Sequence, residues 1–204
     1  MRVRSRYADG RRFLIFGTVQ LTYVRFWCLG LAVLVVDQIT KSWAGRFRDG
    51  AQKYMEVFDW DGFLSLNFTY VTNPGASFSM FSDYPEILTC LAVVALLSIW
   101  FFRQALEMDR LPLQFVFGGI CGGIAGNLTD RLFRGGEVVD FIDFEFYFIP
   151  AYNGFWAGLR NFPIFNVADS AIFVGVVFYL YFGFQDARRN QAEVASNEAS
   201  AEEV

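Results

Sequence analysis

Apolar residues gather in four long runs that are separated by stretches of mixed character. The runs cover residues 26–43, 87–102, 111–127 and 167–184. Each is close to the lower limit of the roughly 17–25 residues that a helix needs to cross a bilayer. We therefore expect four transmembrane helices. The first should stay in the protein, because no small-residue signal-peptide cleavage site follows its apolar run.

Two long segments between these runs, residues 44–86 and 128–166, contain a second pattern. Apolar and polar residues alternate along FLSLNFTYV, which starts at Phe63, and along VVDFIDFEFYFI, which starts at Val138. Alternation of this kind is typical of a strand with one apolar face. Aromatic side chains are frequent here, and they favour the level of the lipid headgroups. The pattern predicts a mainly helical membrane protein with a small extracytoplasmic β-sheet lying on the membrane.

Charge is distributed unevenly along the chain. Residues 1–25 contain six arginines and one acid, whereas residues 185–204 contain five acids and two arginines. Positively charged loops stay on the cytoplasmic side, so we expect both termini there and the two long segments outside. The predicted organisation is a basic cytoplasmic head (1–25), a four-helix membrane domain (26–185) and a small, polar, acidic tail (186–204) that is disordered.

Composition excludes several classes of function. The chain has 204 residues, of which 54% are hydrophobic, and it contains no histidine. A Ser-His-Asp triad, a Cys-His dyad and histidine-ligated metal sites are therefore excluded. Its three cysteines lie far apart and form no CxxC pair, which indicates neither a disulfide framework nor a zinc site. The basic head alone would suit a nucleic acid, but the apolar runs that follow favour a membrane, and we expect no nucleic-acid partner.

Polar residues stand at the predicted outer ends of the helices, where ionisable groups are costly and usually functional. They occur in four short stretches: VDQITK with Asp37 and Lys41, GNLTDR with Asn127, Asp130 and Arg131, EVVDF with Asp140, and FNVADS with Asn166 and Asp169. The predicted topology brings all of them to the outer surface of the membrane.

Taken singly, these features have structural interpretations. Asp37 and Lys41 have the i, i+4 spacing of an ion pair on one helix. The tripeptide Asn73-Pro74-Gly75 has the composition of a type II turn. Asn166 can cap the last helix, with Asp169 in its first turn. The glycines of GGICGGIAG form stripes along a helix that favour close packing, and we prefer that interpretation for them.

The convergence of the polar stretches favours one shared site over independent caps and ion pairs. Asp140 and Asp169 are flanked by apolar sequence, and two carboxylates brought close at low dielectric constant can share one proton. One can then act as general base on a water while the other supplies a proton to the scissile carbonyl or the leaving amine. A Ser–Lys dyad is the competing apparatus, with Lys41 and Lys53 as the only candidate lysines.

The segments VDQITK, NPGASF, GNLTDR, EVVDF and FNVADS, in this order, resemble the five signature segments of the lipoprotein signal peptidase (signal peptidase II) family. The resemblance covers residues 30–185. It implies a four-helix aspartic endopeptidase of the bacterial inner membrane, which removes the signal peptide from diacylglyceryl-modified prolipoproteins by cutting before the lipidated cysteine. It also implies contact with membrane lipids, inhibition by globomycin and chemistry without a metal or other cofactor.

The resemblance also assigns roles to individual residues. Asp140 and Asp169 correspond to the catalytic pair of the family. The residues that would support the site or bind substrate are Asp37, Lys41, Asn73, Gly75, Asn127, Asp130, Arg131, Asn166 and Ala168. Asp130 has a claim to the catalytic pair by motif alone, but we rank it as structural, in an ion pair with Arg131.

Two other functions are compatible with the polar residues. A proton-coupled transporter would use Asp37, Arg131 and Asp169 as relay groups, but a relay needs polar residues across the whole membrane, and the second and fourth runs are apolar in their middles. A non-catalytic membrane scaffold would use the glycine stripes for packing.

The chain also departs from the family pattern, because DRLFRGGEVVD is one residue longer than expected and residues 144–161 form an extended aromatic stretch.

Overall fold

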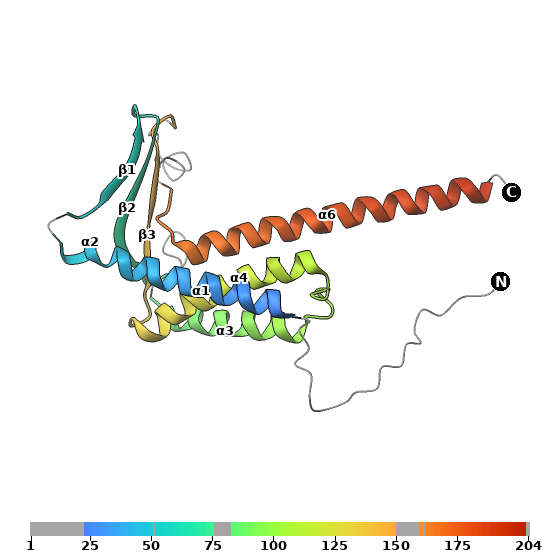
Figure 1. The fold of residues 1–204 in the computed structure, drawn as a ribbon, viewed down its shortest axis with the longest axis horizontal. Coiled ribbons are helices and arrows are strands. Elements are labelled where there is room, and N and C mark those ends of the chain that lie inside the picture. Colours follow the sequence, from blue (N-terminus) through green and yellow to red (C-terminus); the bar gives the residue numbers. More distant parts are fainter. Residues whose placement is uncertain (1–22, 51, 76–82, 150–159, 161, 203–204) are drawn as a thin grey trace.

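The computed structural model describes residues 23–50, 52–75, 83–149, 160 and 162–202. In chain order and with the labels of Figure 1, the elements are α1 (Val24–Ala44), α2 (Arg46–Asp49), β1 (Met55–Trp60), β2 (Leu64–Asn73), α3 (Pro85–Phe101), α4 (Leu111–Phe133), β3 (Val138–Phe146) and α6 (Val167–Glu202). The protein is mainly helical and has one small sheet, as the sequence predicted.

Helix α4 is the centre of the helical part, because α1, α3 and α6 all pack against it. The sheet stands at one end of these helices, and the start of α1 and the end of α6 lie at the other end (Figure 1). A Cβ at Gly118 would lie 2.8 Å from the carbonyl oxygen of Phe26 in α1. A Cβ at Gly123 would collide with the carbonyl oxygen of Ala168 in α6. The glycine stripes therefore pack helices closely, as expected.

Two helices in the described ranges are long and apolar enough to cross a membrane, Leu111–Phe133 and Val167–Glu198. Helix α3 is apolar but has only 17 residues. Helix α1 has 21 residues, and charged side chains occupy its last two turns. Two of the four expected spans are thus supported. Leu31, Leu97 and Phe173, on three different helices, are each more than 60% exposed, which suits a lipid environment better than water.

The three strands form an antiparallel sheet in the order β1-β2-β3. Strands β2 and β3 cover the two alternating segments of the sequence. Strand β1 was not predicted, because the pairing shifts between Glu56 and Phe58 and interrupts the alternation. Five of its six residues are exposed, so no buried face imposes a pattern on its sequence.

Helices α4 and α6 are both longer than predicted. Helix α4 continues to Phe133, so Asn127, Asp130 and Arg131 lie on its last turns and do not follow it. Helix α6 continues to Glu202, where the sequence predicted a disordered tail. The tail is rich in Ala and Glu, which are good helix formers, and extending an existing helix avoids the cost of nucleation.

Candidate active site

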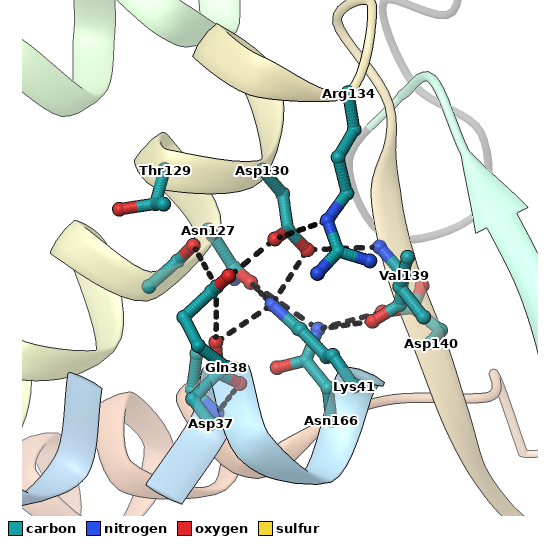
Figure 2. A network of polar contacts seen from close by, with 12 residues as sticks. Asp37, Gln38, Lys41, Asn127, Thr129, Asp130, Arg134, Val139, Asp140 and Asn166 are labelled. Atoms are coloured by element: carbon teal, nitrogen blue, oxygen red, sulfur yellow. Dashed lines mark hydrogen bonds and ion pairs between the residues drawn. The ribbon is translucent and has the colours of Figure 1, made fainter. Parts of the chain in front are cut away.

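Four elements meet where the sheet joins the helices: the last turns of α1 and α4, the start of β3 and the first turn of α6. Figure 2 shows the polar network that joins them. The structure brings together the sequence-predicted residues of these elements. Asn73, at the end of β2, and Gly75, in the turn after it, join them. Most of the remaining NPGASF segment lies outside the described residues.

The start of α6 is closed by a reciprocal pair of hydrogen bonds. The backbone N–H of Asp169 donates to Oδ1 of Asn166 at 2.9 Å. The backbone N–H of Asn166 donates to Oδ2 of Asp169 at 3.2 Å. This arrangement has the geometry of a capping box, so the predicted cap is confirmed. It also holds the Asp169 carboxylate at the N-terminus of the helix, where the helix dipole favours a negative charge.

Asn166 links the two candidate catalytic aspartates. Its side-chain nitrogen donates to Oδ1 of Asp140 at 2.7 Å, while its backbone N–H binds Asp169. Two further amides complete the pair, because Asn73 donates to Oδ2 of Asp140 at 3.3 Å and Asn127 donates to Oδ1 of Asp169 at 2.7 Å. Each carboxylate thus receives two N–H donors, and one asparagine is common to both.

Asp140 lies on β3 and is only 4% exposed. Its pKa is raised to about 7, chiefly because burial disfavours the charged form and next because the charge of Asp169 is near. Hydrogen bonds from Asn73 and Asn166 oppose this rise. The raised pKa allows Asp140 to keep a proton near neutral pH, which is the condition for two carboxylates to share a proton.

A buried ion cluster lies beside the aspartate pair. The ammonium of Lys41 is 2.9 Å from Oδ2 of Asp37 and 2.9 Å from Oδ2 of Asp130, and none of the three side chains is exposed. The predicted i, i+4 pair of Asp37 and Lys41 is confirmed, and both side chains are fully buried. Buried charges are tolerated only when they are paired, and removing one partner costs about 3–5 kcal/mol.

The two carboxylates of this cluster also hold the backbone next to each candidate catalytic residue. Oδ1 of Asp37 accepts a hydrogen bond of 2.9 Å from the N–H of Ala168. Oδ2 of Asp130 accepts one of 3.1 Å from the N–H of Val139. Ala168 directly precedes Asp169, and Val139 directly precedes Asp140. Because Lys41 bridges the two carboxylates, the cluster connects the start of α6 to the start of β3 (Figure 2).

The sequence predicted an ion pair between Asp130 and Arg131, and this prediction is wrong. It binds Lys41 and also Arg134, whose Nε lies 3.2 Å from Oδ1. Adjacent residues on a helix point about 100° apart, which separates the side chains of Asp130 and Arg131. Arg131 donates instead to the carbonyl oxygen of Gly75 at 3.1 Å. Asp130 is fully buried within the ion cluster and does not line the cavity.

The Asn73-Pro74-Gly75 segment is both a turn and part of the site. Oδ1 of Asn73 accepts a hydrogen bond of 2.9 Å from the N–H of Gly75, which forms an Asx turn. The same side chain donates through its nitrogen to Asp140, and Arg131 holds Gly75 from the other side. The turn therefore fixes one wall of the site.

The aspartate pair opens into a cavity of about 760 Å³. At one end its lining is polar: Asn73, Asn127, Arg131, Asp140 and Asp169. Elsewhere the lining is mostly apolar, with contributions from Phe162, Phe165, Ile172, Phe173 and Val176. A cavity of this size and character can hold an extended peptide with an apolar segment. Within the described residues, no group of His, Cys, Asp and Glu is arranged to hold a metal ion.

Sequence reasoning missed some members of the site. Gln38 donates to Asp37 and Asp130, and its place between the two charged residues of VDQITK was the available signal. Arg134 had no distinguishing pattern. Phe162 and Phe165 line the cavity, and nothing in their spacing separates them from the other aromatic residues nearby.

Comparison with known proteins identifies the family of the chain. The profile of the family described as signal peptidase (SPase) II matches residues 29–185. The lipoprotein signal peptidase of Shewanella baltica (strain OS155) is 36% identical over 171 residues, which cover 79% of this chain and 86% of the relative. That of Acaryochloris marina is 34% identical over 172 residues, covering 80% and 91%. A solved structure described as a bacterial membrane enzyme has a TM-score of 0.62 and 25% identity, covering 83% of this chain and 91% of that chain.

Proposed function

The chain belongs to the signal peptidase II family, and on that basis we propose that it removes the signal peptide from diacylglyceryl-modified prolipoproteins by cutting before the lipidated cysteine. Membership makes it a peptidase and a bacterial membrane protein. The aspartic mechanism is our proposal. The observation that carries it is the joining of Asp140 and Asp169 by Asn166 at the polar end of the cavity.

In the resting pair, Asp140 holds the proton and Asp169 is ionised. The raised pKa of Asp140, about 7, supports the first assignment. The helix N-terminus and two N–H donors at Asp169 support the second. A water between the two carboxyls then has a base on one side and an acid on the other.

Hydrolysis proceeds in two steps that restore both aspartates. The water oxygen attacks the scissile carbonyl carbon while Asp169 takes a water proton and Asp140 gives its proton to the carbonyl oxygen. The resulting diol collapses as Asp169 passes its proton to the amide nitrogen and the C–N bond breaks. Asp140 recovers its proton from a hydroxyl of the diol. The Nε of Arg131 is buried without a partner among the described residues, which supports a role in binding a substrate carbonyl.

The position of the site suits a lipidated substrate. Two acyl chains on the substrate cysteine stay in the bilayer, so the scissile bond lies near the outer interface. The aspartate pair stands at the sheet end of the helices, and the cavity continues along apolar side chains of α6 such as Ile172 and Val176. Membrane lipids are thus contact partners of the enzyme, and globomycin competes for this cavity.

The topology that we propose has four spanning helices, with α1 and α3 added to the two long apolar helices. Both termini are cytoplasmic and the active site is at the outer face. The start of α1 and the end of α6 lie at the same end of the molecule, opposite the sheet, which supports this arrangement (Figure 1). Residues 1–25 form the basic head, residues 26–185 the peptidase domain and residues 186–204 an acidic extension.

Neither rival function has comparable support. A transporter needs polar groups along the whole length of its helices. Here the polar network lies at one end of the helices, where Lys41 and Asn166 bind other members of the same network. A scaffold explains the glycine stripes but gives no reason for two joined carboxylates facing a cavity.

A gel-shift assay in detergent tests the proposal. Purified protein is mixed with a diacylglyceryl-modified prolipoprotein and, separately, with the unlipidated form. Cleavage of the lipidated form alone, blocked by globomycin, is the expected result. Folded protein that cleaves neither form would overturn the proposed function.

A further inference from the structure

The side chain of Gln38 joins α1 to α4 beside the buried ion cluster (Figure 2). Its nitrogen lies 3.2 Å from Oδ2 of Asp37, 3.0 Å from Oδ1 of Asp130 and 3.1 Å from the carbonyl oxygen of Gly126. An amide has only two hydrogens for these three acceptors, and a hydrogen bond to a carboxylate is stronger than one to a neutral carbonyl. The amide therefore forms a second bridge between the two carboxylates, next to the ammonium of Lys41.

The hydrogens of Lys41 are divided among three acceptors. Its nitrogen is 2.9 Å from Oδ2 of Asp37, from Oδ2 of Asp130 and from Oδ1 of Asn127. An ammonium has three N–H donors, so one is available for each acceptor. Each carboxylate thus contacts Lys41 through one oxygen, about which it can turn. Gln38 contacts the other oxygen of Asp130, so the two bridges together fix the plane of that carboxylate.

Close packing of the helices leaves little room for the Asp37 carboxylate to move. A Cβ at Gly126 would lie 2.6 Å from Oδ2 of Asp37 and 3.3 Å from the Cβ of Ala168 in α6. A larger residue at position 126 would displace the carboxylate. The approach of α1 to α4 at this glycine also brings Gln38 within reach of its acceptors on α4.

The orientation of the two carboxylates matters because each holds the backbone beside a candidate catalytic aspartate. Asp37 accepts the N–H of Ala168 through Oδ1, and Asp130 accepts the N–H of Val139 through Oδ2. Turning either carboxylate would lengthen one of these hydrogen bonds. The separation of the start of α6 from the start of β3 therefore depends on the bridge made by Gln38.

We propose that Gln38 is a positioning residue, whose bridge between the two carboxylates fixes the spacing of Asp140 and Asp169. Gln38 does not line the cavity, so it acts on the reaction through the residues that it holds. It is also neutral, so replacing it changes the geometry of the cluster without removing a charge. This inference rests on the proposed function of the aspartate pair.

Replacing Gln38 with Met tests the bridge. Gln38→Met keeps the length and the helix propensity of the side chain but removes the donor. We expect kcat to fall about 10-fold with KM nearly unchanged, because small displacements of catalytic groups slow the chemical step. Thr40→Val is the matched control, since the Thr40 hydroxyl donates to carbonyl oxygens of its own helix. A folded Gln38→Met protein with the kcat of the wild type would overturn the proposal.

Replacing Gln38 with Glu gives a readout that a general loss of stability does not produce. The charged groups around Gln38 are Asp37 and Lys41 on α1 and Asp130 and Arg134 on α4. When ionised, the introduced carboxylate repels its two acidic neighbours; when protonated, it donates an O–H in place of the lost N–H. The kcat of Gln38→Glu relative to the wild type should therefore rise as pH falls from 9 to 5, whereas the ratio for Gln38→Met should stay constant. Equal, pH-independent losses in both variants would make Gln38 merely structural and overturn the proposal.

Hydrogen exchange separates this inference from the peptidase function. Exchange of the backbone N–H groups of Ala168 and Val139 reports the grip of the two carboxylates without turnover. It should be several-fold faster in Gln38→Met and unchanged in Thr40→Val. An inactive wild type with this exchange pattern would overturn the peptidase function and leave the positioning role intact. Unchanged exchange in Gln38→Met would overturn the positioning role whatever the activity.

Discussion

Lys41 donates a hydrogen bond of 2.9 Å to Oδ1 of Asn127 and so turns the amide nitrogen of Asn127 toward Asp169. An asparagine amide can adopt either of two orientations. A lysine is a donor only, so it selects the orientation in which the oxygen faces Lys41. The buried charge of Lys41 therefore determines which atom of Asn127 faces Asp169.

Replacing Asn127 with Asp tests this relationship. Asn127→Asp keeps the size of the side chain and the acceptor for Lys41, but it puts an oxygen where the nitrogen faced Asp169. The lost donor and the added negative charge should reduce kcat/KM by about 10²-fold or more. Thermal unfolding in detergent should show a folded protein. Retention of most activity would show that the 2.7 Å contact with Asp169 does not matter for catalysis.

The catalytic assignment predicts that Asp140→Asn and Asp169→Asn each abolish cleavage. Neither change removes an ion pair from the buried cluster, so both variants should insert and bind globomycin at least weakly. Asp130→Asn is the informative companion, because it should chiefly destabilise the fold by weakening the contacts to Lys41 and Arg134. A folded, inactive Asp130→Asn beside an active Asp140→Asn would move the pair to Asp130 and Asp169.

These residues also show how far the sequence could predict the site. The strand that carries Asp140 is predicted by the alternation of apolar and polar residues, and the helix that carries Asp169 is predicted by an apolar run. The predicted membrane topology places both residues at the outer surface and so predicts that they share a site. The partner of Asp130 could not be predicted, because Arg131 and Arg134 are both near in sequence and only the direction of each side chain separates them. The bridge of Lys41 to Asp130 joins α1 to α4, and no spacing within one helix indicates it.

Activity should depend on pH through Asp140. If its protonated form is the acid, kcat/KM falls as pH rises through about 7. Asn73→Ala removes a hydrogen bond that lowers this pKa, so the descending limb should move to higher pH. The native state binds this proton more tightly than the unfolded chain, so the contribution of Asp140 to stability is present below about pH 4 and is lost as pH rises to about 7. A pH–rate profile between pH 5 and 9 for both proteins measures the limb; a limb that stays in place, or moves down, contradicts the assignment.

Close packing of α4 against α6 places Asp169, which gives a matched pair of glycine substitutions. Gly123→Ala puts a methyl group into the backbone of α6 at Ala168 and should displace the residue next to Asp169. We expect destabilisation of about 1–3 kcal/mol and lower activity. Gly183→Ala, on α6, meets nothing within 4 Å and should leave activity unchanged, with a slightly more stable helix. Similar effects of the two changes on cleavage and thermal stability would contradict a role for the close approach.

Asp186 is the residue that anchors the C-terminal part of α6 to the rest of the protein. Asp186 receives two hydrogen bonds from the guanidinium of Arg110, which connects α6 to the loop before α4. Beyond it, residues 190–198 are all exposed. Truncation after Arg189 should therefore leave cleavage and the unfolding temperature nearly unchanged, whereas truncation after Gln185 removes the Arg110 contact and should lower the unfolding temperature. If the variant truncated after Arg189 loses most of its cleavage activity, the acidic extension acts on the enzyme or its substrate.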